Sequence, residues 1–379
     1  MLKIGIECEN IEDIRSRWGI GHMVLNLLRE YSQSPELQSK FKLYLYFKKE
    51  IPRDLGFLEN PIFIKKIAKL PGLTSFNIFY HILMPIRAMM DGVDWMFFPA
   101  YMLPPLYLGK SIVMLTNDVY YEYKFGQSPF RYKLAYRLFA NWAAFRANKI
   151  LAISESSKKE LVKLFRIRPE KIFVSHLGID DKATNQNYIS EIAEKNNKLI
   201  LYVGQMLPRR HAKETILAFK KLVKENPDFN DLSLILVGKD KYRPALIDKL
   251  IEQANGELGS NKIVHYDYIE KDEELSALYN KARLLVYISS AEAFGLPPME
   301  AAILGTPIIV KDNDLNHELF SDSAFFIKNE KDIDEITKAM KEGLTNQSKR
   351  EDFIESYKTL RNRFTWQNFT NQLFKIIEY

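Results

Sequence analysis

Short hydrophobic runs alternate with amphipathic stretches along this 379-residue chain. Runs of period two or of unbroken apolar residues predict strands, and apolar positions spaced three and four apart predict helices. In the first half the expected strands are Leu2–Ile6, Leu43–Phe47, Trp95–Phe98, Ile112–Leu115, Ile150–Ile153 and Ile172–Ser175. The expected helices are Val24–Tyr31, Phe130–Asn148 and Glu155–Phe165. Strands that alternate with helices predict parallel pairing through βαβ units.

The same alternation restarts after a polar, weakly periodic segment, 181–197, which is the expected interdomain linker. The expected strands are Leu199–Val203, Leu232–Val237, Ile263–Tyr266, Leu284–Ile288, Ile308–Val310 and Ser323–Phe326. The expected helices are Ala212–Glu225, Pro244–Gln253, Glu273–Lys281, Lys331–Leu344, Asp352–Leu360 and Trp366–Ile377. The pattern therefore predicts an α/β protein of two similar domains.

The composition, 46% hydrophobic and 27% charged, is that of an ordinary globular protein. The single cysteine, Cys8, excludes a disulfide within the chain and suits a reducing compartment. Because Met1 runs almost directly into the first strand and no apolar run reaches membrane-span length, we expect neither a signal peptide nor a transmembrane helix. Residues 1–185 hold 27 Lys and Arg against 18 Asp and Glu (+9), and the remainder 27 against 30 (−3). The basic half predicts an anionic partner: an acidic lipid surface, a phosphorylated acceptor or nucleic acid.

The most specific motif runs from Glu292 to Glu300, with seven residues between these glutamates. Pro297 and Pro298 favour an extended entry and then a helix start, so Glu300 is expected in the first helical turn, and Gly305 is expected to end the helix after two turns. The loop is expected to present free backbone N–H groups, which attract anions. The alternative for Glu300 is a carboxylate that only complements the helix dipole.

This motif, with the strand after it, resembles the glutamate pair of retaining GT-B glycosyltransferases, in particular glycosyltransferase family four. The resemblance implies two Rossmann-like domains facing each other across a cleft. It implies an acceptor-binding domain, 1–183, to which the last helix (365–379) returns, and a nucleotide-sugar domain, 184–364. It also implies that Glu292 faces the donor sugar and that Glu300 binds the ribose hydroxyls. The amides of Phe294, Gly295 and Leu296 would lie near the sugar and the diphosphate.

A second motif follows the strand Leu199–Val203: Gly204 makes a turn, and Arg209 and Arg210 stand before the next helix. A guanidinium group is always charged and can donate two parallel hydrogen bonds to the oxygens of one phosphate. The alternative is a pair of solvated loop arginines. The resembled family commonly has Gly-Arg where this chain has Gly204-Gln205, and lysine where it has Arg210. The resemblance also implies backbone contacts to the nucleotide base near Tyr268 and Ile269.

Two weaker signals lie in the first domain. Gly19 and Gly21 resemble the family's glycine loop, which approaches the donor phosphate or the acceptor, although a purely structural turn fits them equally. Asn117 and Asp118 follow a strand at the expected edge of the cleft, where family members often have His-Asp. Asn117 can hydrogen-bond a hydroxyl but cannot shuttle a proton. The alternative is that the two residues cap a turn.

Residues 120–149 combine six basic side chains with many aromatic ones and a single acid, Glu122. Such a helix suits an anionic membrane interface, and the alternative is a packed helix with a solvated basic face. No nucleic-acid-binding motif is present, so nucleic acid is not an expected partner. Asp312-Asn313-Asp314 has the Asp-x-Asp form of a metal site from a different fold, but its context indicates a loop. We expect no essential metal and no cofactor other than the donor substrate.

The combined interpretation is a retaining glycosyltransferase in which Glu292, Arg209 and Arg210 act on a nucleoside diphosphate sugar. A GDP-mannose-like donor is preferred, and a UDP-sugar is the alternative. The acceptor would be a glycan or a lipid-diphosphate-linked saccharide of surface polysaccharide synthesis. We expect a cytoplasmic protein, peripheral on the inner face of the membrane. The rival interpretations are a non-catalytic scaffold that binds sugar nucleotides and a GT-B epimerase or phosphorylase.

Overall fold

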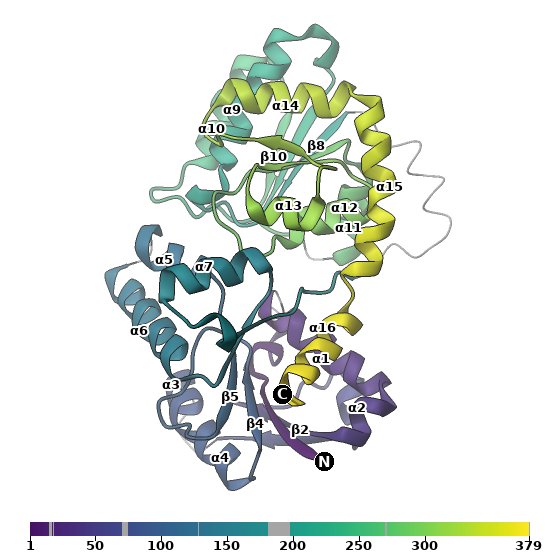
Figure 1. Cartoon of the computed structure of the whole chain (residues 1–379). Coiled ribbons are helices and arrows are strands. Elements are labelled where there is room, and N and C mark those ends of the chain that lie inside the picture. The colour runs from purple at the N-terminus through teal and green to yellow at the C-terminus, as the bar shows by residue number, and fades with distance from the viewer. Residues whose placement is uncertain are drawn as a thin grey trace. The chain divides into compact units, whose positions relative to one another are not determined.

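The computed structural model describes residues 1–14, 17, 19–69, 75–127, 129–180, 198–269 and 271–378. The expected linker, 181–197, lies outside these residues. The chain forms two compact units (Figure 1). The N-terminal unit comprises Met1–Gly178 together with Phe364–Tyr379, and the C-terminal unit comprises Ile179–Arg363.

The N-terminal unit is built on a seven-stranded parallel sheet in the order β3-β2-β1-β4-β5-β6-β7. Its strands are β1 (Leu2–Glu7), β2 (Phe41–Phe47), β3 (Phe63–Ile67), β4 (Trp95–Phe98), β5 (Lys110–Met114), β6 (Lys149–Ala152) and β7 (Ile172–Val174). In β1 and β2, Leu2 stands opposite Phe41 and Glu7 opposite Tyr46. The strands read as nearly unbroken apolar runs because helices cover both faces of the sheet.

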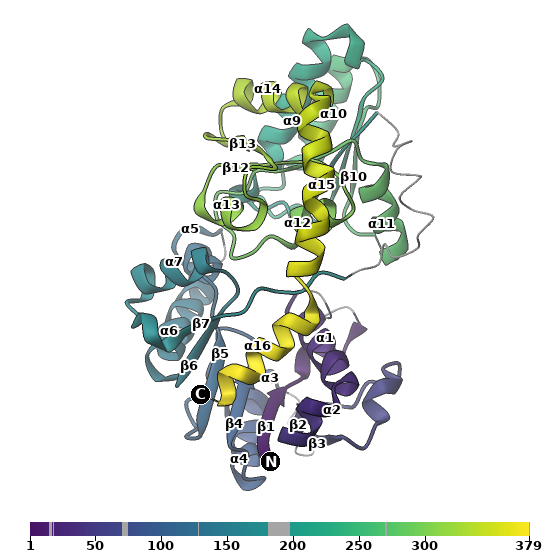
Figure 2. The same ribbon diagram turned by 45° about the vertical axis from the view of Figure 1, so that its right-hand side comes forward.

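Helices of the N-terminal unit form two layers. They are α1 (Ile20–Gln33), α2 (Pro35–Lys40), α3 (Phe76–Ile78), α4 (Met84–Met90), α5 (Asp118–Phe125), α6 (Phe130–Arg146), α7 (Glu155–Phe165) and α16 (Trp366–Glu378), and the π-helical turn η4 (Phe79–Leu83) joins α3 to α4. The last helix, α16, lies beside α1 (Figure 2), where Phe374 stacks on Tyr31 with ring centroids 5.8 Å apart. Helices α4, α6 and α7 pack on the other face, in a core that includes Tyr46, Phe98 and Ile150.

The C-terminal unit is built on a six-stranded parallel sheet in the order β10-β9-β8-β11-β12-β13. Its strands are β8 (Leu199–Val203), β9 (Ser233–Val237), β10 (Ile263–Tyr266), β11 (Leu284–Tyr287), β12 (Ile308–Lys311) and β13 (Phe325–Ile327). Its helices are α9 (Ala212–Glu225), α10 (Ile247–Leu258), α11 (Asp272–Lys281), α12 (Leu296–Ile303), α13 (Asp314–Phe320), α14 (Ile333–Thr345) and α15 (Gln347–Arg363). Helices α9, α10 and α14 share one core with the sheet.

Several helix starts differ from the sequence predictions, and in two of them an aspartate side chain gives the reason. The helix expected from Pro244 begins at Ile247, because the Asp240 carboxylate accepts hydrogen bonds from Leu246 N (2.8 Å) and Ile247 N (2.9 Å) and so caps the helix there. The helix expected from Lys331 begins at Ile333, because the Asp332 side chain accepts hydrogen bonds from the next turn. Strand β3 and the continuous helix α3–η4–α4 were not predicted.

Candidate functional site

The strand order of the C-terminal unit reverses between β8 and β11, and the chain leaves both strands at their carboxyl ends. Ligands of doubly wound sheets bind in the crevice at such a reversal. The turn after β8 carries Arg209 and Arg210 within a short 3-10 helix, Pro208–Arg210 (η6). The loop after β11 carries Glu292. The fold therefore brings together two predicted groups that are more than 80 residues apart in sequence.

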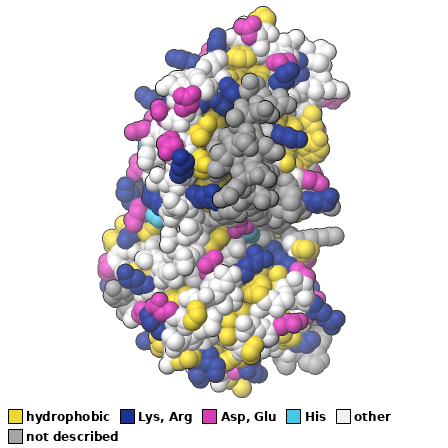
Figure 3. All heavy atoms as spheres, turned by 90° about the vertical axis from the view of Figure 1, so that its right-hand side faces the viewer, with side chains coloured by type: hydrophobic (Ala, Val, Ile, Leu, Met, Phe, Trp, Pro, Cys, Tyr) yellow, Lys and Arg dark blue, Asp and Glu magenta, His cyan; other side chains and the backbone are white. Residues whose placement is uncertain are grey.

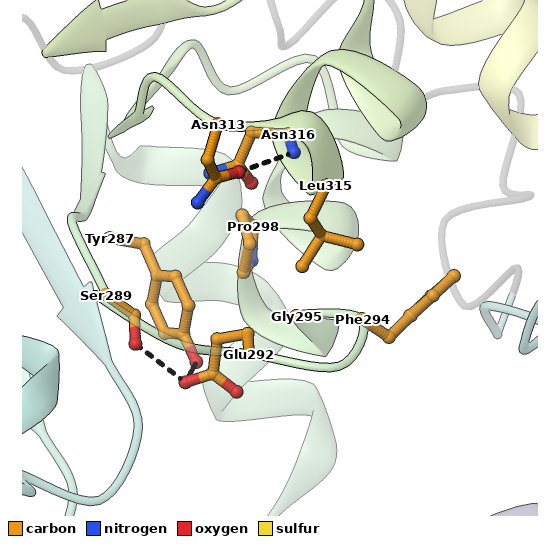
Figure 4. A pocket seen from close by; sticks show the side chains of 9 residues that line it. All are labelled: Tyr287, Ser289, Glu292, Phe294, Gly295, Pro298, Asn313, Leu315 and Asn316. Atoms are coloured by element: carbon orange, nitrogen blue, oxygen red, sulfur yellow. Dashed lines mark hydrogen bonds between the residues drawn. The ribbon is translucent and has the colours of Figure 1, made fainter. Parts of the chain in front are cut away.

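Glu292 accepts hydrogen bonds from both arginines. Arg209 Nη1 lies 2.7 Å from Glu292 Oε1, Arg210 Nε lies 2.7 Å from the same oxygen, and Arg210 Nη2 lies 3.3 Å from Oε2. The hydroxyls of Tyr287 and Ser289 also donate to Oε1, each at 3.0 Å (Figure 4). The three charged side chains are between 12% and 19% exposed, so this ion cluster is largely desolvated.

The cluster holds Glu292 in its charged form. Burial alone would raise the pKa of its carboxyl group, but the charges of Arg210 and Arg209 and the hydrogen bonds from Arg210 and Tyr287 lower this pKa to about 2. With Glu292 ionised and both guanidinium groups protonated, the cluster carries a net charge of +1. It is therefore suited to bind an anion, and its carboxylate cannot act as a proton donor near neutral pH.

Two glycines shape this site. Gly204 has φ +135°, and a Cβ at this position would lie 3.1 Å from Arg210 Nη1, so the turn needs glycine both for its backbone and for the space next to the guanidinium. Gly295 has φ +93° and is the N-cap of α12. It lies beside Pro298, Asn313 and Leu315 in a small pocket that also includes Glu292 (Figure 4).

The start of α12 differs from the prediction. The helix begins at Leu296, so Pro297 and Pro298 are its second and third residues. Because proline has no N–H, the second and third residues of this helix offer no amide to an anion. Glu300 is the fifth residue of α12 and lies beyond its first turn. Because the helix dipole acts mainly within the first turn, a role for Glu300 that only complements the dipole is not supported. The helix ends before Gly305, which has φ +70°, as predicted.

Glu300 is held by a tyrosine from a neighbouring helix. Tyr279 of α11 is buried, and its hydroxyl donates to Glu300 Oε2 at 2.8 Å. Thr306 Oγ1 in turn donates to the backbone oxygen of Tyr279 at 2.6 Å.

Phe294, another residue of the predicted donor site, is buried, with 3% of its surface exposed. Tyr268 and Ile269 follow the edge strand β10, two strands away from β8, and Tyr268 is 54% exposed.

A second polar row supports the arginine turn, and the sequence analysis missed it. His211 has a left-handed backbone conformation, with φ +53°. Its Nε2 atom lies 2.6 Å from Ser290 Oγ, and the Ser290 hydroxyl donates a hydrogen bond to Glu330 Oε1 at 2.7 Å. Lys311 Nζ lies 2.7 Å from Glu330 Oε2. Burial alone would raise the pKa of Glu330, but the hydrogen bonds from Lys311 and Ser290 lower it to about 2. In the sequence, the only sign of this row is that His211 directly follows the two arginines.

The predicted residues of the N-terminal unit lie at the carboxyl edge of its sheet. Gly19 is the N-cap of α1 with φ +54°, as a glycine loop requires. Gly21, in contrast, is a buried residue inside α1, so it does not form the structural turn that was the alternative for it. Asn117 is the N-cap residue of α5, 4% exposed, and Asp118 is the first residue of that helix.

Asp312, Asn313 and Asp314 have structural contacts. The Asn313 side chain accepts a hydrogen bond from Asn316 N at 2.9 Å and so caps α13, and Asp312 Oδ1 lies 2.8 Å from His317 Nε2. Among the residues that the structure describes, no group of three or more His, Cys, Asp or Glu side chains could hold a metal ion. Within those same ranges, no helix has the length and apolar character needed to cross a bilayer.

Comparisons with known proteins agree with this geometry. Residues 185–359 match the family model described as glycosyl transferases group 1. The serotype-specific mannosyltransferase WbdA of Escherichia coli is 34% identical over 144 residues, 38% of this chain and 17% of that protein. The O-antigen chain mannosyltransferase B of Escherichia coli is 27% identical over 237 residues, 60% of this chain and 59% of that protein. The match therefore spans only part of the length of either relative.

A solved structure shows the same fold over the whole chain. The crystal structure of Anabaena HepE in complex with UDP and glucose superposes with a TM-score of 0.70 and 14% identity, covering all of both chains. At this identity the likeness concerns the fold alone. Residues 185–359 thus match the glycosyl transferases group 1 family, and the chain as a whole has the two Rossmann-like units of the GT-B fold.

Proposed function

We propose that this chain is a glycosyltransferase that transfers a hexose from a nucleoside diphosphate sugar bound to its C-terminal unit. The observation that carries the proposal is the buried cluster of Arg209, Arg210 and Glu292 at the strand-order reversal. This cluster lies within the residues that match the glycosyl transferases group 1 model. Two of the matched relatives are named mannosyltransferases, which supports the same class of reaction.

The cluster fits the charge that such a reaction develops. When the bond between the sugar and the diphosphate breaks, negative charge grows on the leaving phosphate oxygens. Two guanidinium groups held in fixed positions stabilise this charge, because they are already oriented and partly shielded from water. In this proposal Arg209 and Arg210 provide the positive charge, with the amides of Gly295 and Leu296 as further donors, and no metal is essential.

Glu292 has an orienting role in this proposal. Its ionised carboxylate, bonded to Arg209, Arg210, Tyr287 and Ser289, fixes the guanidinium planes and faces the donor sugar. We also propose that the reaction retains the anomeric configuration by a front-side attack assisted by the leaving group, as the family resemblance implies. Nuclear magnetic resonance of the anomeric proton in the product would decide this point.

The preferred donor is GDP-mannose or a related sugar, because the matched relatives are named mannosyltransferases. A UDP-sugar is the alternative, because HepE was solved in complex with UDP and glucose. For the acceptor we propose a glycan or a lipid-diphosphate-linked saccharide in surface polysaccharide synthesis, which is supported by the relative named as an O-antigen chain mannosyltransferase.

Calorimetric titration of the purified protein with GDP, UDP and ADP, without added metal, tests the proposal. We expect one nucleotide to bind and the Glu300→Ala variant to lose most of that affinity, because Glu300 would no longer hold the ribose. The nucleotide that binds then selects the donors for a transfer assay. A folded protein that binds none of the three nucleotides would refute the proposal and favour a non-catalytic scaffold.

A further inference from the structure

Helix α6 of the N-terminal unit exposes four large apolar side chains. Phe130, Leu134, Leu138 and Phe145 are 79%, 42%, 60% and 80% exposed. At 100° per residue these four positions fall within an arc of about 80°, so they form one line along the helix, which we call the apolar stripe. The buried residues on its inner side are small, namely Ala140, Ala143 and Ala144, and the partly buried Tyr136 and Trp142 pack against the same core. A surface helix of a globular protein normally turns its large apolar side chains to the core and its polar side chains to water.

Exposed apolar residues concentrate in the same unit. Of the 18 large hydrophobic side chains that are exposed among the described residues, 16 belong to the N-terminal unit and only Tyr266 and Tyr268 to the C-terminal unit. Two of the 16, Leu106 (49%) and Leu108 (71%), lie next to the end of α6, where Arg146 Nη2 is 3.5 Å from the backbone oxygen of Leu108. Leu108 therefore lies near the C-terminal end of α6, and Leu106 precedes it by two residues.

Basic side chains border the apolar stripe on both sides. Arg137 and Arg131, both exposed, lie about 20° beyond the two edges of the arc. Arg146 and Lys171 stand at the end of α6, where Lys171 Nζ is 2.8 Å from the backbone oxygen of Phe145. Burial and the nearby positive charges of Arg168 and Arg146 lower the pKa of Lys171. The cations at this end therefore repel one another, and an anionic surface would relieve that repulsion.

The opposite side of this unit has a different character. In the lower part of Figure 3, which views the molecule from the side away from α6, Lys and Arg side chains stand among Asp and Glu side chains. Within 120–149, which includes α6, Glu122 is the only acidic residue against six basic ones. A line of apolar side chains bordered by basic ones is the arrangement by which a helix lies in the interface of an anionic bilayer.

We propose that the apolar stripe, with Leu106 and Leu108, is the surface by which the N-terminal unit docks on an anionic lipid bilayer. The four side chains of the stripe enter the headgroup region, and Arg131, Arg137 and Arg146 contact lipid phosphates. The inference does not depend on the identity of the sugar donor. It is consistent with a lipid-linked acceptor, which would be presented at the same surface.

Two other occupants fit less well. In a symmetric dimer formed through this surface each arginine would face the arginines of the second copy, because a two-fold interface brings a patch onto itself. Nucleic acid would contact the arginines, but Leu134, Leu138 and Leu108 have no role in binding phosphates or bases. A bilayer uses both the charged and the aliphatic side chains.

Vesicle flotation with the full-length chain tests the proposal. The wild type should float with vesicles of phosphatidylcholine and phosphatidylglycerol, and much less with phosphatidylcholine alone. The Phe130→Ser, Leu138→Ser, Phe145→Ser triple variant should lose binding by at least about tenfold, because the apolar side chains that enter the interface are gone. The matched control is Ile67→Ser on β3, where an isoleucine that is 40% exposed lies outside the proposed surface; it should bind like the wild type.

A second pair of variants tests the charges. The Arg131→Gln, Arg137→Gln variant should lose the preference for phosphatidylglycerol, and added salt should weaken wild-type binding, since exposed charges are screened. Circular dichroism and nucleotide titration verify that each variant is folded and that its donor site is unchanged. The proposal is refuted if the wild type does not float with anionic vesicles or if the triple variant floats as the wild type does. It is also refuted if the triple substitution abolishes a dimer in sedimentation without changing vesicle binding.

Discussion

Arg210 and Glu292 form a two-point ion pair, with Nε 2.7 Å from Oε1 and Nη2 3.3 Å from Oε2. The pair joins the turn after β8 to the loop after β11. A guanidinium held at two points keeps its plane fixed, which is the property that bidentate recognition of a phosphate requires. The same pair also neutralises part of the charge that a diphosphate would meet. This double role leads to the first prediction.

Substitution Glu292→Gln should destabilise the protein and make it more responsive to nucleotide. Removing the carboxylate leaves two buried guanidinium groups without this partner, which should lower the free energy of unfolding by about 3 kcal/mol. A bound diphosphate would replace the lost negative charge. Thermal melts with and without GDP or UDP should therefore show a larger nucleotide-induced rise in Tm for the variant than for the wild type, while transfer activity falls.

The control for that experiment is Glu330→Gln. Glu330 has the same side-chain exposure as Glu292, 12%, and is paired with Lys311 at 2.7 Å. Its loss should also destabilise the unit, but Glu330 is bonded to Lys311 and Ser290, so both arginines keep Glu292 as their partner. Equal nucleotide-induced shifts in both variants would contradict a diphosphate site at the two arginines.

Substitution Tyr279→Phe should weaken nucleotide binding about tenfold. The variant lacks the hydroxyl that donates to Glu300 Oε2, so Glu300 is no longer held in one orientation toward the ribose. A tenfold change corresponds to about 1.4 kcal/mol, which is the upper end of the range for one typical hydrogen bond. Calorimetry measures the effect. Tyr107→Phe removes a buried hydroxyl from the N-terminal unit, so it should leave nucleotide affinity unchanged.

Substitution Gly204→Ala should displace Arg210. The backbone of Gly204 has φ +135°, and the new Cβ would lie 3.1 Å from Arg210 Nη1. We expect loss of stability, by about 1–3 kcal/mol from backbone strain, together with loss of nucleotide affinity. Gly259→Ala is the control, because Gly259 also has positive φ (+66°) but an added Cβ there meets no atom within 4 Å. If both variants bind nucleotide equally well, Gly204 has only a backbone role.

Substitution Glu7→Gln should stabilise the protein at alkaline pH. Glu7 is fully buried at the end of β1, and burial raises the pKa of its carboxyl group to about 8. The folded state therefore keeps a proton that the unfolded state loses above about pH 4.5, so wild-type stability should fall as the pH rises from about 4.5 to 8 and then level off. Urea unfolding between these pH values should show a shallower decline for the variant. An identical decline would show that Glu7 is not the group responsible.

The alternating strands and helices, and the reactive groups at the strand ends, could be predicted from local sequence patterns. Glu155–Phe165, Leu199–Val203 and Ala212–Glu225 have the predicted bounds, because periodicity and capping are local properties of neighbouring residues. The paired arginines, and Glu292 after another strand, could likewise be found as motifs. The continuous helix α3–η4–α4 could not, because its exposed apolar residues, such as Ile82 and Ile86, obscure the amphipathic period.

The tertiary structure alone decided which of these groups meet. Arg209 reaches Glu292, and Tyr279 reaches Glu300, because β8 and β11 are neighbours in the sheet and α11 lies against α12. The row of His211, Ser290, Glu330 and Lys311 likewise draws on separate strands. Strand order and helix orientation result from packing between distant segments, which a local pattern does not encode. For the same reason only the structure reveals that α6 buries Ala140, Ala143 and Ala144 and leaves Phe130 and Phe145 exposed.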